Sequence, residues 1–195
     1  GRDSNPDWRR RDAWLAALER MLRENMCPIA EAIRSDFGNR SLHETQLLEL
    51  FPSFEAIGHA RHHLKSWMRP ERRAVSMWFL PGRARVLHQP LGVVGIIVPW
   101  NYPLLLAVGP LVAALAAGNR VMVKMSEYTP AMSDLFARLV AKYFADDEVV
   151  VVQGDAAALF EEFVYNEDGQ FLTGTFADYL VPTVSEIPKV EMLHQ

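Results

Sequence analysis

Three apolar runs of strand length, separated by two segments of helix length, constrain the fold of this chain more than any other feature. The runs are residues 93–98, 121–123 and 149–152, and the segments between them are residues 104–117 and 131–144. None of the runs alternates in polarity, which is typical of parallel strands in a sheet that helices cover on both faces. The sequence therefore predicts an α/β protein that contains a βαβαβ unit.

The amino-terminal residues predict helices instead of strands. Residues 7 to about 68 carry apolar side chains three and four positions apart, with a break at residues 25–28, where Pro28 is expected to start a second helix. Pro52 lies inside the apolar stripe of the next long helix and is expected to kink it. The positions expected to be buried along that stripe are Leu47, Leu50, Phe51, Phe54, Ile57, Leu64 and Trp67.

Composition narrows the classes of partner. The chain has 195 residues, 20 basic and 24 acidic side chains, a net charge of −4 and one cysteine, Cys27. This acidic balance argues against nucleic acid or an anionic membrane as the main partner, and one cysteine excludes an internal disulfide. The longest apolar run, about residues 104–117, is shorter than the roughly 20 residues of a membrane span. Charged residues crowd the start of the chain instead of a signal peptide, so we expect a cytoplasmic protein.

The loops that follow the three apolar runs are the candidate ligand site. Right-handed crossovers place residues 99–103, 124–127 and 153–155 at one edge of the predicted sheet, where open α/β sheets bind ligands. They supply an amide, an ammonium and a carboxylate, which we expect beside a planar or sugar-bearing ligand, with helix N-termini available for phosphate. No Gly-x-Gly-x-x-Gly motif follows the first run. The residues alone therefore leave nucleotide binding open.

Several consecutive motifs occupy these loops and the helices around them. They are Gln-Pro-Leu-Gly-Val-Val-Gly-Ile-Ile-Val-Pro-Trp-Asn-Tyr-Pro at 89–103, Ala-Ala-Gly-Asn at 116–119 and Val-Lys-Met-Ser-Glu-Tyr-Thr-Pro at 123–130. Together they resemble the aldehyde dehydrogenase superfamily, over roughly residues 7–160. Ser-Asp-Phe-Gly at 35–38 and His-Glu-Thr at 43–45 are most similar to the coniferyl-aldehyde dehydrogenase branch. In this family NAD(P)+ accepts hydride from the thiohemiacetal of a cysteine thiolate, and the thioester is then hydrolysed.

The resemblance implies roles for three residues of the first loop. Asn101, which matches the asparagine of the Trp-Asn-[Phe/Tyr]-Pro motif, is expected to donate its amide hydrogen to the developing oxyanion. Pro99 and Trp100 are expected to line the nicotinamide end of the cofactor site. The catalytic role in this chain therefore falls to Asn101.

The resemblance also implies a cofactor-binding role for the second loop. Lys124, Ser126 and Glu127 match the Lys-Pro-Ser-Glu motif, in which the lysine and the glutamate hold the adenosine ribose hydroxyls. A carboxylate at Glu127 repels a 2′-phosphate, so we expect NAD as the cofactor, with NADP as the alternative. Met125 stands where the motif has proline, which leaves the rigidity of this loop open.

The domain organisation expected from these patterns has four segments. An amino-terminal helical segment (1–68) precedes a linker and lead-in strand (69–90), of which residues 69–82 have neither helical nor strand periodicity. A partial dinucleotide-binding domain (91–162) and an unrelated tail (163–195) follow. The expected fold is amino-terminal helices, an incomplete Rossmann-like βαβαβ parallel sheet and a short hairpin-like tail.

The tail from residue 164 to residue 194 resembles a carboxyl-terminal piece of the large subunit of molybdopterin-dependent hydroxylases. Asp168 and Gly169 predict a hairpin turn between two short apolar strands. An alternative interpretation takes Phe-Leu-Thr-Gly-Thr at 171–175 as a version of the Phe-Thr-Gly-Ser-Thr loop of aldehyde dehydrogenases, which touches the cofactor phosphates. We favour the first interpretation, in which the sequence joins two incomplete pieces.

The nucleophilic cysteine and the general-base glutamate of the family lie beyond the third strand. In this chain the only cysteine, Cys27, falls on the second predicted helix, where we expect it to be a small buried side chain. His59, His62 and His63 have helical spacing but are expected to form a solvated helix face, and no metal site is predicted. The isolated chain is therefore expected to lack aldehyde turnover.

Two functions from different classes remain. The first is a truncated NAD(P)+-dependent aldehyde dehydrogenase, an oxidoreductase favouring an aromatic aldehyde such as coniferyl aldehyde, that keeps part of the cofactor site. The alternative is a non-catalytic fragment or fusion that self-associates through an exposed sheet edge.

Overall fold

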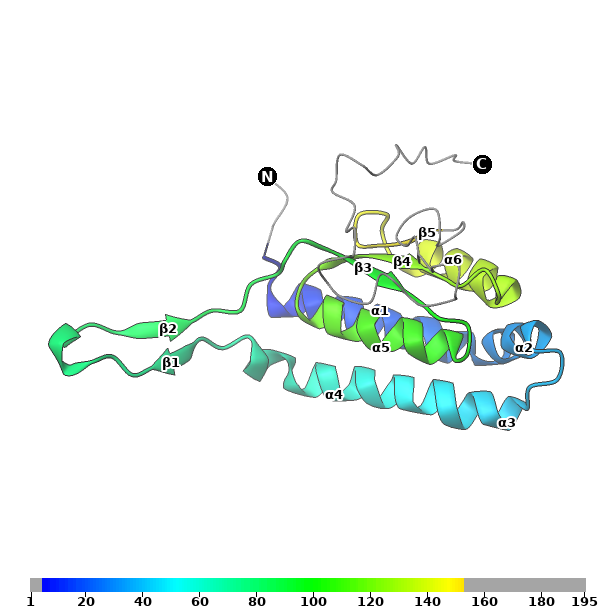
Figure 1. Ribbon diagram of the computed structural model, residues 1–195, viewed down its shortest axis with the longest axis horizontal. Coiled ribbons are helices and arrows are strands. Elements are labelled where there is room, and N and C mark those ends of the chain that lie inside the picture. The colour runs from blue at the N-terminus through cyan, green and yellow to red at the C-terminus, as the bar shows by residue number, and fades with distance from the viewer. Residues whose placement is uncertain (1–4, 153–195) are drawn as a thin grey trace, which may run out of the picture. The chain divides into compact units, whose positions relative to one another are not determined.

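The computed structural model describes residues 5–152 (Figure 1). These residues lie within one compact unit of the chain, Gly1–Gln153. The third predicted loop, at residues 153–155, and the predicted tail from residue 163, with its turn at Asp168, fall outside the described residues.

A three-stranded parallel sheet consists of β3 (Val93–Ile97), β4 (Arg120–Lys124) and β5 (Val149–Val152). Helix α5 (Pro103–Ala116) connects β3 to β4, and helix α6 (Pro130–Tyr143) connects β4 to β5. The predicted βαβαβ unit is confirmed, with every boundary within one residue of its expected position. None of the helices in this described part is long and apolar enough to cross a membrane.

The sheet is covered differently from the prediction. Its strands lie in chain order, β3-β4-β5, so two right-handed crossovers in the same direction place α5 and α6 on the same face. On the other face, the side chains of Val93, Ile97 and Met122 are 60%, 53% and 44% exposed. The expectation that helices cover both faces is therefore wrong for the described residues. Apolar runs indicate buried strands, but they do not reveal the strand order.

The amino-terminal residues form helices, as predicted. Helix α1 (Trp8–Glu24) is followed by α2 (Met26–Asp36) and by the short α3 (Leu42–Thr45). A π-helical turn, η1 (Gln46–Leu50), joins α3 to the long helix α4 (Phe51–Trp67) without a break. Helix α2 begins two residues before the expected start, so its proline occupies the first turn, where no intrahelical N–H bond is lost.

The π turn explains how a proline is accommodated inside this long helical segment. Pro52 lies in the first turn of α4, and the N–H of Phe51 donates to the carbonyl of Gln46, five residues earlier. A proline ring collides with the carbonyl four residues before it in a regular α-helix, and the wider π turn relieves this collision. The extra residue also rotates the buried face. Of the expected stripe, Leu50, Ile57 and Leu64 are buried, whereas Leu47, Phe51 and Trp67 are exposed.

The helices and the sheet share one hydrophobic core. Helix α1 packs against α4, α5 and α6, and α4 runs alongside α5 (Figure 1). Leu15, Leu18 and Leu22 of α1 are fully buried in the same cluster as Val121 and Val123 of β4. The amino-terminal helices therefore form a layer behind α5 and α6, on the side away from the sheet.

The segment at residues 69–90 forms an antiparallel hairpin where the sequence predicts a linker and lead-in strand. Strand β1 (Glu71–Arg73) pairs with β2 (Ala84–Val86), and a short 3-10 helix, η2 (Met77–Phe79), lies near the tip. The hairpin extends away from the helices and the sheet (Figure 1). Its most exposed apolar side chains, with 66–86% of their surface open to solvent, are Met77, Trp78, Phe79 and Leu80.

Candidate functional site

The loops after β3 and β4 begin at the same edge of the sheet. Ile97 is the register partner of Lys124, and the N–H of Val98 donates to the Lys124 carbonyl at 2.9 Å. The chain then leaves β3 through Pro99 and leaves β4 through Met125. Two of the three predicted loops are thus confirmed as neighbours at the carboxyl edge.

The first loop presents the side-chain amide of Asn101 at the surface of the described residues. Asn101 is exposed, and among the described residues nothing forms a hydrogen bond with its carboxamide. Its backbone carbonyl accepts a hydrogen bond from Nη2 of Arg40 at 2.9 Å. Trp100 is 53% exposed with its ring centroid 6.2 Å from that of Phe37, and Pro99 is exposed as well. The loop therefore offers a hydrogen-bond donor and an apolar surface at the edge of the sheet.

The second loop presents an ammonium–carboxylate pair. The Lys124 ammonium is almost buried, and its Nζ donates to the carbonyl of Met125 at 2.7 Å and to Oε2 of Glu127 at 2.8 Å. The hydrogen bond from Lys124 lowers the pKa of Glu127, so this carboxylate is ionised at neutral pH. An ammonium has three N–H donors and a carboxylate has about four lone-pair sites, so the pair retains donor and acceptor capacity.

Ser126 and Met125 stabilise the turn between this pair and α6. The Ser126 side chain is buried, with its Oγ accepting from the N–H of Tyr128 at 3.3 Å. The Ser126 carbonyl accepts from Oγ of Ser133 at 2.9 Å. Met125, at the proline position of the motif, is 3% exposed and belongs to the hydrophobic core. Packing and hydrogen bonds thus hold the loop where the motif has a proline.

The N-terminus of α6 is already bonded to a carboxylate. Both oxygens of Asp36, at the end of α2, accept hydrogen bonds from the N–H groups of Ala131 and Met132, at 2.9 and 2.8 Å. Thr129, which precedes Pro130 at the position of a local cap, instead donates its hydroxyl to the Ser126 carbonyl. The expectation that this helix end is available for phosphate is wrong, because a protein anion binds there.

The N-terminus of α5 is bonded in the same way. Oε2 of Glu49 accepts hydrogen bonds from the N–H groups of Leu104 at 2.8 Å and Leu105 at 3.2 Å. Glu49 is fully buried, and this burial raises the pKa of its carboxyl against the opposing effect of the two N–H donors and of Arg40. The N-termini of α5 and α6 are therefore both bonded to carboxylates of the protein itself.

Asp36 and Glu49 were missed by the reasoning from sequence. The signal that points to them is indirect, because α5 and α6 each begin with a proline and neither has a side-chain cap from the preceding residue. A helix end that lacks a local cap and is buried requires a partner from elsewhere in the chain.

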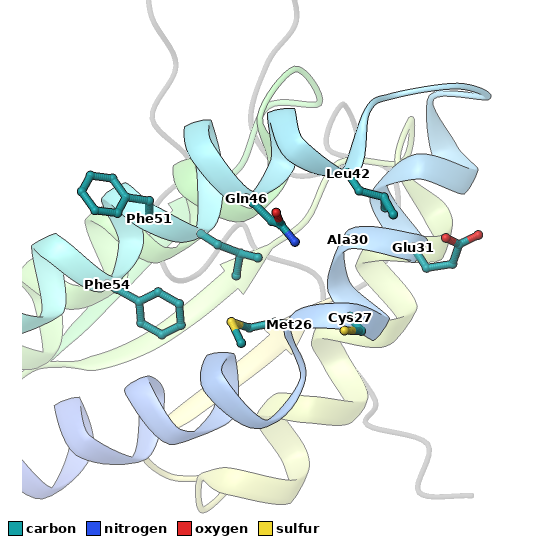
Figure 2. Close-up of a pocket in the computed structure, with 9 residues that line it drawn as sticks. Met26, Cys27, Ala30, Glu31, Leu42, Gln46, Phe51 and Phe54 are labelled. Carbon is teal, nitrogen blue, oxygen red and sulfur yellow. The ribbon is translucent and has the colours of Figure 1, made fainter.

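Cys27 lies apart from the strand ends. It is exposed, so the expectation of a buried side chain is wrong. It lies beside a cavity of about 470 Å³ between α2, α3, η1 and α4 (Figure 2). The cavity is lined by Met26, Cys27, Ala30, Glu31, Leu42, Gln46, Leu50, Phe51 and Phe54. The thiol therefore lines a different surface from the one that carries Asn101.

The rings of the three histidines of α4 lie close together, beside Trp67. The ring centroids of His59 and His63 are 4.2 Å apart, and the His63 ring is stacked on Trp67 at 5.7 Å. Within residues 5–152, no group of three or more His, Cys, Asp or Glu side chains has the arrangement needed to hold a metal ion.

The parallel sheet, the crossover helices and the polar groups at the carboxyl edge define the class of this protein as Rossmann-like α/β. A family model described as "Aldehyde dehydrogenase family" matches residues 4–175. The chain belongs to the aldehyde dehydrogenase family.

Similar proteins agree with this family in sequence and in structure. A probable coniferyl aldehyde dehydrogenase of Pseudomonas aeruginosa is 53% identical over 150 residues, which cover 77% of this chain and 32% of that protein. The coniferyl aldehyde dehydrogenase of a Pseudomonas species is 42% identical over 187 residues, 89% of this chain and 38% of that protein. The substrate-bound structure of Staphylococcus aureus AldH has a TM-score of 0.75 at 28% identity, over 78% of this chain and 33% of that one. A Mycobacterium tuberculosis aldehyde dehydrogenase complexed with NAD+ has a TM-score of 0.64 at 28% identity, over 74% of this chain and 29% of that one.

The extent of these matches shows how much of its relatives' length this chain covers and where the family match ends. The chain spans about a third of the length of the curated relatives that it matches. The family match ends at residue 175, beyond the expected end near residue 160, and thus includes residues 171–175. This agrees with the alternative interpretation, in which residues 171–175 are a version of the Phe-Thr-Gly-Ser-Thr loop of aldehyde dehydrogenases.

Proposed function

We propose that residues 99–127 contribute part of the active site of an NAD(P)+-dependent aldehyde dehydrogenase. The observation that carries this proposal is the meeting of two polar groups at one sheet edge. The carboxamide of Asn101, which has no hydrogen-bond partner within residues 5–152, follows β3, and the Lys124–Glu127 pair follows the neighbouring β4. The bound cofactor supplies the hydride acceptor, and these side chains supply hydrogen bonds and charge.

The chemistry assigned to Asn101 is oxyanion stabilisation. When a nucleophile attacks an aldehyde, the carbonyl oxygen gains negative charge, and a preorganised N–H donor contributes about 3–4 kcal/mol to the lowering of the barrier. The carboxamide of Asn101 can donate to that oxygen without breaking a bond within the described residues. Trp100 and Pro99, both exposed beside it, line the nicotinamide end in this proposal.

The chemistry assigned to Lys124 and Glu127 is recognition of the adenosine ribose. Two neighbouring hydroxyls need one donor and one acceptor, which an ammonium–carboxylate pair provides. The ionised Glu127 repels a 2′-phosphate, which favours NAD+ over NADP+. Ser126 stabilises the turn that carries Lys124 and Glu127, because its Oγ accepts a hydrogen bond from the N–H of Tyr128.

The substrate that we propose is an aromatic aldehyde. This step rests on the names of the relatives, because proteins described as coniferyl aldehyde dehydrogenases or probable ones are 53%, 42% and 40% identical to this chain. Coniferyl aldehyde is therefore the first substrate to test in a protein that contains this chain and a complete site.

Loss of nucleotide binding on removal of the ion pair tests the site. We expect NAD+ and AMP to bind the 195-residue chain and NADP+ to bind more weakly, in calorimetric titrations. Lys124→Ala combined with Glu127→Ala removes two charge-assisted hydrogen bonds and is expected to weaken NAD+ binding by at least about tenfold. The matched control is Glu31→Ala with Arg34→Ala, which removes an ion pair of the same spacing, at 3.5 Å, on α2.

The control pair is expected to leave the affinity for NAD+ unchanged. NAD+ binding that survives the loss of Lys124 and Glu127 contradicts the assignment of the ribose site. NADP+ binding that is tighter than NAD+ binding contradicts the role given to the Glu127 carboxylate.

Self-association is the second candidate function, and the exposed apolar surface favours it. Within residues 5–152 the outer edge of β3 has no strand partner, and Val93 and Ile97 are more than half exposed on the uncovered face. Trp78 at the hairpin tip is 86% exposed. Unpaired strand edges and large apolar patches favour pairing with another chain.

Light scattering coupled to size-exclusion chromatography tests this second function. We expect the chain to elute as a dimer or larger species, because burial of the exposed apolar surface stabilises the association. Trp78→Ser with Val93→Lys is expected to shift the population toward the monomer, and Tyr128→Ser, at a residue that is 71% exposed, is the control. A wild-type chain that is monomeric at all concentrations contradicts the alternative.

A further inference from the structure

We propose that Arg40 and Glu49, two residues of the amino-terminal helical layer, position the Asn101 loop for its role in the reaction. This inference rests on the proposed function, since it concerns the same loop. Arg40 lies between α2 and α3, and Glu49 lies in the π turn η1. Neither residue follows a strand, so neither belongs to the site as the sequence predicts it.

Arg40 holds the backbone of the loop. Its Nη2 donates to the carbonyl of Asn101 at 2.9 Å, and its side chain is only 12% exposed. The guanidinium carbon lies 3.7 Å from the ring centroid of Phe37 and 5.0 Å from that of Tyr102. A planar guanidinium combines a directed hydrogen bond with ring contacts, which a lysine ammonium does not reproduce. Arg40 thus fixes the peptide group that joins Asn101 to Tyr102.

Glu49 holds the other end of the loop. Its Oε2 accepts from the N–H groups of Leu104 and Leu105 in the first turn of α5, and its Oε1 lies 3.3 Å from Nη1 of Arg40. Glu49 is 0% exposed, so no water competes for these bonds. One carboxylate therefore joins the start of α5 to the guanidinium that holds Asn101.

Arg40 and Glu49 can position the loop because both side chains are largely buried and have few other hydrogen-bond partners. Arg40 also lies 3.6 Å from Glu44, a more exposed carboxylate, whereas Glu49 in addition accepts hydrogen bonds from the first turn of α5. The Asn101 carboxamide has no partner of its own in the described part of the chain, so the backbone determines where it lies. A misplacement of about 1 Å can cost about a hundredfold in rate, so a rigid backbone matters for an oxyanion donor.

Amide exchange and carbonyl chemical shifts of the 195-residue chain, measured by NMR, test the proposal. Glu49→Ala is expected to accelerate exchange at Leu104 and Leu105 by about tenfold through loss of the helix cap. It is also expected to shift the Asn101 carbonyl resonance, because Arg40 loses its anchor. Glu49→Gln retains an acceptor oxygen and is expected to keep exchange at these two amides slow.

Arg40→Lys keeps the positive charge and removes the planar guanidinium with its several directed N–H donors. We expect it to shift the Asn101 carbonyl and the Tyr102 amide resonances while the α5 amides stay protected. Asp36→Ala is the matched control for Glu49→Ala, since it removes the equivalent carboxylate from α6 and should affect Ala131 instead. Arg40→Lys and Glu49→Gln are conservative, so the test does not depend on the folding of Glu49→Ala.

The proposal is overturned if Glu49→Gln exchanges as fast as Glu49→Ala, or if Arg40→Lys leaves the Asn101 and Tyr102 resonances in place. Addition of NAD+ to the same samples tests the proposed function separately, through the resonances of Lys124 and Glu127. Protection at α5 without any response to NAD+ supports the positioning network and counts against the cofactor site.

Discussion

NADH formation by the isolated 195-residue chain is expected to stay at the background rate with both aromatic and aliphatic aldehydes. Oxidation through a thiohemiacetal needs a thiolate at the carbonyl carbon, and the only cysteine, Cys27, lines the helical cavity instead of the sheet edge. A single oxyanion donor, the role that we propose for Asn101, contributes about 10² to 10³ in rate, which does not replace a nucleophile. The measurement is NADH absorbance against an enzyme-free control.

If turnover is seen, two variants show which side chains it depends on. Cys27→Ser is expected to change nothing, and turnover that disappears in it contradicts the separation of Cys27 from Asn101. Turnover lost only in Asn101→Ala shows that a group other than the Cys27 thiol completes the site at the Asn101 loop. The second result also supports the oxyanion role of Asn101, so the two variants test different parts of the argument.

The elements around the site could be predicted because their signals are local. Residues 93–98 and 121–123 are apolar runs of strand length, and the segment between them has the length and composition of a helix. The handedness of crossovers then brings Asn101 and Lys124 to the same edge without any further information. The structure places both there, with Ile97 and Lys124 in register.

The contacts that hold the site could not be predicted, because they join distant positions. Glu49 lies 55 residues before Leu104, and Asp36 lies 95 residues before Ala131. No local pattern pairs a carboxylate in one helix with the first turn of another. In the sequence, Thr129 before Pro130 is itself a residue that favours helix caps, and only the structure shows that neither Thr129 nor Tyr102 caps the helix that follows it.

The periodicity of the sequence also failed to predict which side chains at the start of α4 are buried. A 3.6-residue repeat assumes an uninterrupted α-helix, and the π turn at Gln46–Leu50 adds one residue to the count. Leu47 and Phe51 consequently lie on the exposed side, while Glu49 enters the core next to α5. The same turn that defeats the prediction of the stripe delivers the carboxylate to the Asn101 loop.

The Ala-Ala-Gly-Asn motif at 116–119, which helped to identify the family, has a structural role in this chain. Oδ1 of Asn119 accepts hydrogen bonds from the N–H groups of Leu91 at 2.7 Å and Gly92 at 3.1 Å, at the start of β3. Gly118 ends α5 with a φ of +85°, a conformation that glycine adopts freely. This motif therefore sets the path of the chain into the sheet.

Gly118→Ala is expected to lower the free energy of unfolding by about 2–5 kcal/mol, from backbone strain together with overpacking. An added Cβ at this position lies 2.6 Å from Nε and Cζ of Arg11. Arg11 is 4% exposed, and it donates from Nε to the Pro6 carbonyl at 2.9 Å and from Nη1 to the Ala116 carbonyl at 3.0 Å. The guanidinium can make room only by giving up these bonds. Urea denaturation measures the loss.

A double-mutant cycle separates the strain from the collision. In an Arg11→Ala background the added methyl group meets no guanidinium, so Gly118→Ala is expected to cost only about 1–2 kcal/mol from the positive φ. Equal costs in the two backgrounds contradict the collision, and leave the backbone conformation as the whole reason for glycine at this position. A smaller cost without Arg11 shows that glycine is needed at this position for contact with α1 as well as for the backbone conformation. The contact between Arg11 and Gly118 then links the helical layer to the start of the sheet.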